Sequence, residues 1–183
     1  MTGRTRLALA IGAVVILIAG AVALLLNVRD GGTGGHTPGG DGEYGTLGPQ
    51  PQGADAATAA KYGLIAMFSW QPANDYGPGA AMARATPWLT GYLAAEATGA
   101  PATGIRALPE WARWRAGGDT VTALVTITGT GQPVNGQCLV TAEVRQIVQH
   151  RDNTTTPWRV MTVAASVSDT ATGWKLANYR VTG

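Results

Sequence analysis

The sequence has a single cysteine, Cys138, and only two histidines, His36 and His150, among its 183 residues. One cysteine cannot form a disulfide bond within the chain, and these three residues are not spaced like the ligands of a zinc site. We therefore predict neither a metal site nor a bound cofactor. Because Cys138 stands at the start of a strand-like apolar run, we expect its thiol to be buried.

Charged residues are also scarce, at 13% of the chain, and their formal net charge is +2. Proteins that bind nucleic acids usually carry a dense basic face, and no segment of this sequence supplies one. We therefore expect no direct nucleic-acid partner.

The longest apolar segment covers residues 7–28 and contains no charged residue. As a helix it would measure about 33 Å, enough to cross a hydrocarbon core of about 30 Å. A cleaved signal peptide would share the basic start at Arg4 and Arg6, with a cleavage site near Ala21 to Ala23. The apolar run nevertheless continues through Leu26, too long for a signal peptide. We therefore predict an uncleaved, single-pass transmembrane helix.

The charges on the two sides of this segment predict its orientation. Residues 1–6 carry two arginines, whereas Arg29 on the other side is balanced by Asp30. The positive-inside rule then places residues 1–6 in the cytoplasm as a short tail and the rest of the chain outside it. We predict a protein of the cell membrane that binds the bilayer through residues 7–28.

Residues 29–53 are rich in glycine and proline, with 10 glycines among the 24 residues from Asp30 to Gly53. Such a composition buries too little apolar surface to fold and behaves as a flexible coil. We predict a linker at 29–53 and one extracytoplasmic domain at 54–183, which is a normal size for a single core.

The first part of this domain has helical periodicity. Asp55 is a predicted N-cap, and Ala57, Ala60, Leu64 and Phe68 follow at spacings of three and four residues. A second helix is predicted from Ala80 to Ala97. Because Pro87 lies inside it, either the helix kinks there or Thr86 caps a new helix. A short helical turn is predicted at 108–115.

The second part alternates with a period of two, which is typical of strands. We predict strands at 120–129, 138–149, 158–167 and 174–181, joined by short polar turns. In the second of these, Gln146 and Ile147 interrupt the alternation, which indicates a bulge or a strong bend. Strands joined by short turns pair antiparallel, so the domain is predicted to be α+β, with two to three helices on a curved four-stranded meander.

One segment combines aromatic and basic side chains. Trp111, Arg113, Trp114 and Arg115 lie within five residues, and Trp70 ends the first helix. Indoles and guanidinium groups together could bind an anionic partner, so these five residues are a candidate interaction surface. In the alternative interpretation, an indole closes the end of the core and the arginines cover it.

These elements resemble a known fold. The helix ending in Phe-Ser-Trp-Gln-Pro (68–72), the Ala-Arg-Ala-Thr-Pro-Trp-Leu-Thr segment (83–90), the meander and the closing Gly-Trp-Lys-Leu strand (173–176) look like the cone-shaped nuclear transport factor 2-like fold. With the anchor and linker, the layout is similar to inner-membrane assembly components of conjugal transfer and type IV secretion machines. It is also similar to the Mce-associated membrane proteins of actinobacteria.

The resemblance to conjugation components implies a structural role in assembling a translocation channel. The Mce-associated resemblance implies support of a lipid importer instead. Other envelope subunits and further copies of the same chain are the partners that either role implies. The 83–90 segment favours the conjugation role.

A third interpretation is a small-ligand binder or an enzyme, because cones of this fold also resemble ketosteroid isomerases and polyketide cyclases. Such enzymes need an acid or base inside the pocket. The candidate side chains fall in predicted turns, at a strand end or opposite the apolar face: Asp75, Tyr76, Asp119, His150 and Glu143. Asn178 and Arg180 alternate in step with Leu176, which would place a polar patch inside the cone. We expect no enzymatic activity.

Overall fold

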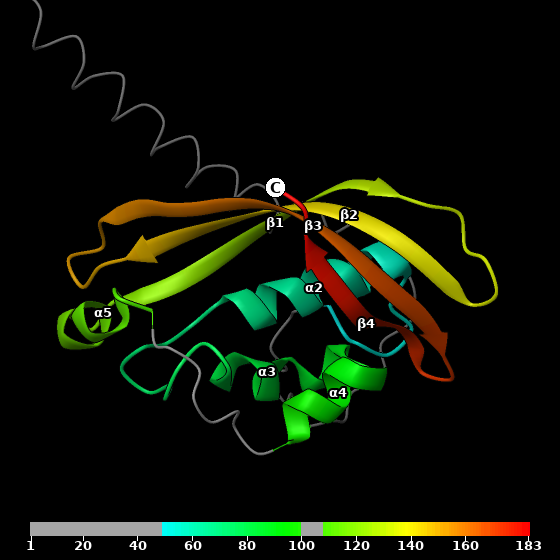
Figure 1. Ribbon diagram of the computed structural model, residues 1–183, viewed down its shortest axis with the longest axis horizontal. Helices are drawn as coiled ribbons and strands as arrows, with labels where there is room; N and C mark the ends of the chain where they lie inside the picture. Colours follow the sequence, from blue (N-terminus) through cyan, green and yellow to red (C-terminus); the bar gives the residue numbers. More distant parts are fainter. Residues whose placement is uncertain (1–48, 100–107) are drawn as a thin grey trace, which may run out of the picture. The chain divides into compact units, whose positions relative to one another are not determined.

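The computed structural model describes residues 49–99 and 108–183, which form an α+β domain of helices packed on a four-stranded antiparallel sheet (Figure 1). The predicted tail, transmembrane helix and most of the linker lie outside the described residues. Among the helices within those two ranges, none combines the length and the apolar character needed to cross a bilayer.

The first described helix, α2, runs from Ala56 to Phe68, as the periodicity predicts. The carboxylate of Asp55 accepts a hydrogen bond of 2.7 Å from the N–H of Thr58, which confirms the predicted N-cap. This hydrogen bond also lowers the pKa of Asp55. The helix lies so close to the sheet that a Cβ on Gly63 would lie 3.0 Å from the Leu176 side chain, so a larger residue here would require that side chain to shift.

The predicted helix at 80–97 is three separate elements. They are α3 (Ala80–Ala85), the 3-10 turn η1 (Thr86–Trp88) and α4 (Gly91–Thr98). A new helical turn does begin at Thr86 with Pro87 in its first turn, as one of the two alternatives predicts, but it ends at Trp88 and a third element follows. Between η1 and α4 the backbone is extended. Leu89 forms a parallel bridge to Leu176, and Thr90 donates its N–H to the Leu176 carbonyl at 3.0 Å. Pairing with the sheet therefore interrupts the helix.

The last helix, α5, spans Trp111–Gly117 and so begins and ends later than the predicted turn at 108–115. Gly118 follows it with a φ of 68°, and its N–H bonds back to the last turn of the helix. This left-handed residue is a common way for a helix to end before a strand.

The four strands form the predicted meander in the order β1-β2-β3-β4. Their bounds are Thr120–Thr130, Gln137–Gln149, Thr155–Thr170 and Gly173–Val181, and all neighbouring pairs are antiparallel. The second and third strands are the longest, and β4 pairs only with the second half of β3, from Val163 onward.

A bulge does interrupt the pairing of β2 with β3 at Gln146 and Ile147, as predicted, but the extra residue belongs to β3. Gln146 lies opposite Arg159 and Ile147 opposite Pro157, so Trp158 has no partner. The alternation in β2 itself is intact, because Gln146 is fully buried between Val144 and Val148. Its Nε2 donates to the Phe68 carbonyl at 2.7 Å, which fixes the end of α2 to the sheet.

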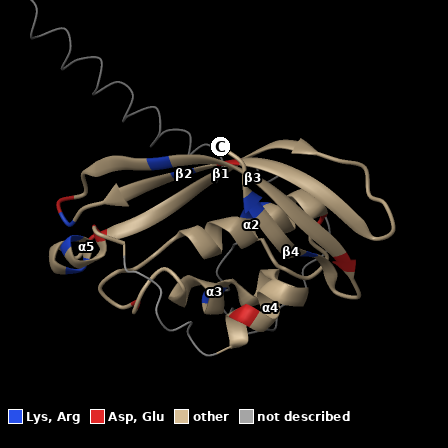
Figure 2. Ribbon diagram, in the orientation of Figure 1, with Lys and Arg blue, Asp and Glu red and all other residues tan. Residues whose placement is uncertain are grey.

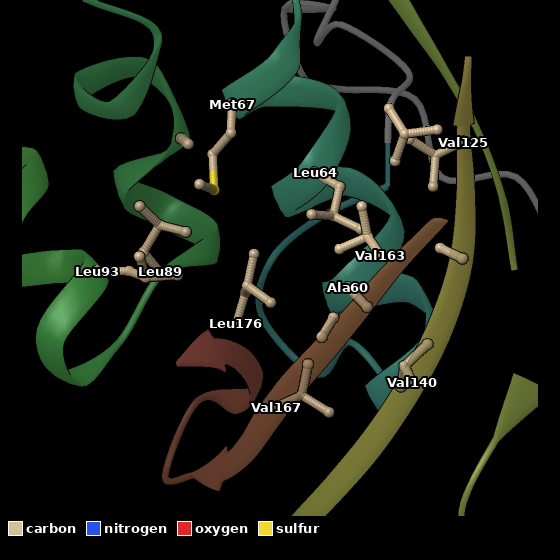
Figure 3. Packing of buried hydrophobic residues seen from close by; sticks show 14 of the residues in the cluster. Ala60, Leu64, Met67, Leu89, Leu93, Val125, Val140, Val163, Val167 and Leu176 are labelled. Atoms are coloured by element: carbon tan, nitrogen blue, oxygen red, sulfur yellow. The ribbon is translucent and has the colours of Figure 1, made fainter. Parts of the chain in front are cut away.

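The main core lies between α2 and the inner face of the sheet. Figure 3 shows Ala60, Leu64 and Met67 of α2 among valines of the strands and leucines of the segments that follow α2. Cys138 belongs to this core and is 4% exposed, which confirms its predicted burial. Burial of this kind is worth about 1.5–3 kcal/mol per large side chain, so this interface is the main source of the domain's stability.

Candidate interaction site

Four tryptophans from three separate segments meet at one end of the sheet. Trp70 follows α2, Trp111 and Trp114 come from α5, and Trp158 comes from the bulge in β3. The ring centroids of Trp114 and Trp158 are 4.8 Å apart, and those of Trp70 lie 5.5 Å from Trp158 and 5.8 Å from Trp111. We call these four residues the tryptophan cluster. Their tilted and edge-on geometries are those that aromatic rings prefer.

Local sequence explains how each ring reaches the cluster. Trp111 and Trp114 are three residues apart, so they share one face of α5. Trp70 is held by an antiparallel bridge, in which it exchanges hydrogen bonds of 2.8 and 2.9 Å with Val121. Trp158 packs beside Val121 because it is the extra residue of the bulge. A helix face, a β-bridge and a bulge therefore together build one aromatic core.

The structure buries the indoles of the candidate interaction surface. Trp70, Trp111 and Trp114 are 5%, 5% and 1% exposed. Arg113 and Arg115 of α5 are exposed. This arrangement is the one described by the alternative interpretation, in which indoles close the end of the core. A partner at this end would contact the arginines and not the indole faces.

The guanidinium group of Arg115 is hydrogen-bonded to other residues of the domain. Its Nε donates to the carbonyl of Pro72 at 2.8 Å, and its Nη2 donates to the carbonyl of Asp75 at 2.7 Å. These bonds attach α5 to the loop after α2. Arg113 makes no hydrogen bond or ion pair with the residues at 49–99 and 108–183, so it is the more available cation of the two.

A second arginine organises the same loop. Arg84 of α3 donates from two guanidinium nitrogens to the carboxylate of Asp75, at 2.5 and 2.9 Å, and also to the carbonyl of Ser69 at 3.1 Å. The N–H of Gln71 donates to the same carboxylate at 2.7 Å. Burial alone would raise the pKa of Asp75, but the bonds from Arg84 and Gln71 outweigh it and lower the pKa.

An open groove of about 360 Å³ lies between the end of α2, the start of β1 and Arg84. Its lining combines apolar residues such as Ile65 and Trp70 with polar residues: Ser69, Gln71, Arg84, Thr120 and Thr122. The volume falls at the lower end of the range of about 300–1,000 Å³ that is usual for small-ligand sites. Arg84 is already paired with Asp75, so its charge is largely neutralised within the domain.

The groove adjoins an unusual sheet edge. β1 pairs with β2 on one side, and on the other side it pairs only with Ser69 and Trp70, near Val121 and Ala123. From Val125 onward, no described residue pairs with this side of the strand. β1 also contains no charged residue (Figure 2).

The candidate acid and base residues do not meet in the groove. Asp119 and His150 do meet each other: the Nδ1 of His150 is 3.1 Å from Asp119, and its Nε2 is 2.9 Å from the hydroxyl of Thr156. A carboxylate, an imidazole and a hydroxyl bonded in this order also form the catalytic triad of hydrolases. However, Thr156 lies exposed on a strand, without the strained turn that presents a nucleophile. The imidazole thus links the starts of β1 and β3.

The remaining candidates lie on the surface or in structural contacts. Tyr76 is 64% exposed, and Glu143 forms a 3.1 Å ion pair with Arg145 on the outer face of the sheet. Asn178 and Arg180 are exposed, so the predicted polar patch beside Leu176 is wrong. A second bulge explains the error, because Val167 pairs with Leu176 and Ser166 with Asn178, which leaves Ala177 as an extra residue.

Sequence reasoning missed Arg84, Thr156 and the open edge of β1. Arg84 stands in the segment predicted as the second helix, and only the tertiary structure brings it to Asp75, nine residues earlier. The edge position of β1 had a signal in the sequence, because the first strand of a meander has a neighbouring strand of that meander on one side only.

Comparison with known proteins identifies no family. No family description matches the sequence, and no curated protein matches it significantly. Among solved structures, the intermembrane space region of the chloroplast protein ARC6 is similar to this chain. The alignment covers 70% of this chain and 96% of the ARC6 chain, at 20% sequence identity. The TM-score of that alignment is 0.36.

Proposed function

We propose that this chain is a membrane-anchored, non-catalytic assembly component of a cell-envelope translocation machine, of the conjugal transfer or type IV secretion kind. In this proposal the helices and sheet form a nuclear transport factor 2-like module. The anchor at 7–28 holds the module outside the cytoplasm, where it binds other envelope subunits.

The observation that carries the proposal is that α2 fills the inner face of the sheet. Leu64 of α2 and Val140, Val163 and Leu176 of the strands are all fully buried in one contiguous core. A ligand-binding or catalytic domain of this shape needs that space for its substrate. The same residues make a rigid body well suited to contacts on its outside.

The distribution of charged groups supports the same function. Asp75 is paired with Arg84, and Lys175 donates to the carbonyl of Pro87 at 2.5 Å. Catalytic acids and bases are normally free to reach a substrate, whereas these groups hold loops in place. On the outside, Leu124, Leu139 and Val160 are each at least half exposed on the outer face of the sheet, which offers apolar contact area.

The proposal is tested by deleting the gene in its native host and measuring conjugal transfer. We expect transfer to be abolished, restored by the full chain, and not restored by a chain lacking residues 7–28. Unchanged transfer in the deletion strain would reject the conjugation role. Lipid uptake measured in the same strains distinguishes the alternative, because a loss of uptake with normal transfer would indicate a lipid importer.

A further inference from the structure

The open edge of β1 has a feature that sheet edges normally avoid. Natural edge strands are protected by charged residues, proline, bulges or a covering element, because unpaired backbone groups attract other strands. Ser69 and Trp70 cover the start of β1, and a bulge follows at Thr128, but from Leu124 to Ile127 the strand has none of these protections. The residues there are leucine, valine, threonine and isoleucine, and the β-branched ones favour further pairing. We propose that two copies of this chain pair antiparallel through β1, with a two-fold axis at Thr126.

The other edges of the sheet show the contrast. The outer edge of β4 is covered at Leu176 by the segment of Leu89 and Thr90. The part of β3 that extends beyond β4 contains Pro157, which has no N–H to donate, and the exposed Arg159. Both edges thus have a covering segment, a proline or a charged residue, which the stretch of β1 from Leu124 to Ile127 lacks.

The free backbone groups of β1 can be assigned from its existing bonds. Val121 exchanges hydrogen bonds with Trp70, so its N–H and C=O point away from β2. Backbone groups alternate along a strand, so those of Ala123, Val125 and Ile127 point the same way. The N–H of Ala123 is already bonded to the hydroxyl of Ser69 at 3.1 Å. Val125 and Ile127 therefore each present a donor and an acceptor at the open edge.

The path of α2 leaves this part of the edge accessible. The C-terminal end of α2 continues into Ser69 and Trp70, which pair with the start of β1. Its N-terminal end lies at the opposite edge of the sheet, where Trp174 donates its N–H to the carbonyl of Ala54 at 3.0 Å. The helix thus crosses the sheet beneath the strands (Figure 1), and among the described residues no backbone group of α2 bonds to Val125 or Ile127.

One register of self-pairing satisfies all four free groups of each copy. With the axis at Thr126, Val125 of one copy lies opposite Ile127 of the other, and each such pair exchanges two hydrogen bonds. The two pairs give four bonds, which use the N–H and C=O of both residues in both copies. The register ends at Thr128, where the pairing of β1 with β2 shifts, so the match is confined to the regular part of the strand.

Side chains fit the same register. Leu124, which is 50% exposed, comes to lie opposite Thr128 of the second copy, and the half-buried Ile127 lies beside Val125. Thr126 faces its own symmetry mate, a favourable cross-strand pair, and no like charges meet. The Gly- and Pro-rich segment at 29–48 is poorly suited to pair with the edge of β1 in place of a second copy, because glycine and proline are unfavourable in strands. The proposal deepens the assembly role but does not depend on which machine the chain serves.

Disulfide cross-linking of the full chain in membranes tests the register directly. In the proposed pair, Thr126 and its mate are a non-hydrogen-bonded pair with Cα atoms about 4.5 Å apart, within the span of a disulfide. We expect Thr126→Cys to give a disulfide-linked dimer on mild oxidation. The matched variant Leu124→Cys lies on the same face, but its two thiols would be separated by about 13 Å along the strands, so it should not cross-link.

The wild-type chain controls for Cys138, whose thiol is buried. Equal cross-linking at positions 124 and 126, or none at 126, would overturn the proposal. Cross-linking of the Thr126→Cys variant to a different protein would also overturn it, because the edge would then take another occupant. In each of these cases the transfer assay above is unaffected, so failure of the pairing and failure of the assembly role are distinguishable.

A charge variant tests the same contact in the full chain purified in detergent. Thr126 and Thr162 lie on either side of Glu143 in one row of the sheet, Thr126 at the edge and Thr162 in the interior strand β3. Thr126→Lys places two lysines opposite each other at the axis, so we expect the dimer to become monomeric. Thr162→Lys adds the same charge beside the same glutamate and should leave the dimer intact. Equal effects of the two substitutions on the measured mass would contradict the proposal.

Discussion

Asp75 and Gln146 show how single polar side chains fix the end of α2. The carboxylate of Asp75 accepts hydrogen bonds from Arg84 and from the N–H of Gln71. The side chain of Gln146 in β2 donates to the carbonyl of Phe68. Both side chains are buried, where a polar atom without a partner is costly, and Oε1 of Gln146 has no partner among the described residues. Exchanging one oxygen or nitrogen atom in either side chain should therefore weaken the bonds that hold the loop after α2.

Replacing Asp75 with asparagine should destabilise the domain by about 1–3 kcal/mol at neutral pH, because bonds from a guanidinium to a charged partner are lost. The pKa of Asp75 is below its ordinary value of 3.8 in the folded protein. Its stabilisation is therefore complete above that value and is lost as the pH falls through the folded pKa.

Urea unfolding at several pH values measures this effect. The difference between the wild type and Asp75→Asn should be constant from about pH 5 to pH 7 and should shrink below about pH 4. Asp169→Asn makes the same chemical change at an exposed site and serves as the control. A difference that grows on acidification would contradict the assignment.

Replacing Gln146 with glutamate should have the opposite pH dependence. A carboxylate at this fully buried position is disfavoured, so its pKa in the folded state would be raised. The protonated acid can still donate to the Phe68 carbonyl, whereas the ion cannot. We expect the variant to lose stability as the pH rises above about 4.3, the ordinary value for glutamate. Thermal melts at about pH 4.5 and pH 7.5 measure this, and equal deficits at both would disprove it.

At the scale of elements, α5 and the bulge in β3 act as one unit, because each supplies rings to the tryptophan cluster. α5 has only seven residues, which is too short for a stable isolated helix. Trp111 and Trp114 therefore stabilise it by packing on Trp70 and Trp158. Removing a ring should loosen the helix together with the loop that Arg115 holds.

Replacing Trp114 with alanine should cost about 3–5 kcal/mol of folding stability, as for other large aromatic residues removed from a core. Arg113→Ala, on the neighbouring exposed position of the same helix, should change stability by less than about 0.5 kcal/mol. Chemical denaturation of the two variants gives both values. A small effect at Trp114 would mean that the cluster is not part of the stable core.

The elements also show where sequence reasoning succeeds. The strands of the meander and α2 were predictable because local alternation and helical periodicity are decided by burial of one face. In the segment at 80–97, proline indicated the break at Pro87, but the second break was not predictable, because Leu89 and Thr90 leave the helix to pair with Leu176, far along the chain. The faces of Asn178 and Arg180 were mispredicted for the same kind of reason, since a bulge depends on the partner strand.

The candidate site was likewise predictable only in part from the sequence. The sequence showed that tryptophans and arginines cluster at 111–115, but not which of them are buried. Trp70 and Trp158 reach the cluster only through a β-bridge and a bulge. These are properties of strand pairing, and they leave no periodic signal in the residues themselves.

At the scale of the whole molecule, the proposal joins a predicted anchor at 7–28 to the domain that the structure describes. We expect the full chain to remain in the membrane fraction after washing with alkaline carbonate, because the apolar run is long enough to span a bilayer. A chain lacking residues 7–28 should be released into the soluble fraction. Release of the full chain by the same wash would contradict the anchor.

The entry of the chain into the domain has a mechanical consequence. The N–H of Gly53 donates to the carbonyl of Thr172 at 2.9 Å, and the carbonyl of Ala54 accepts from Trp174, so the turn between β3 and β4 grips the residues just before α2. Tension applied through the preceding chain would load these two bonds and the β3–β4 hairpin before it reached α2. A force applied through the preceding chain would thus act on the rim of the sheet, while α2 and the core beneath the sheet would not be loaded.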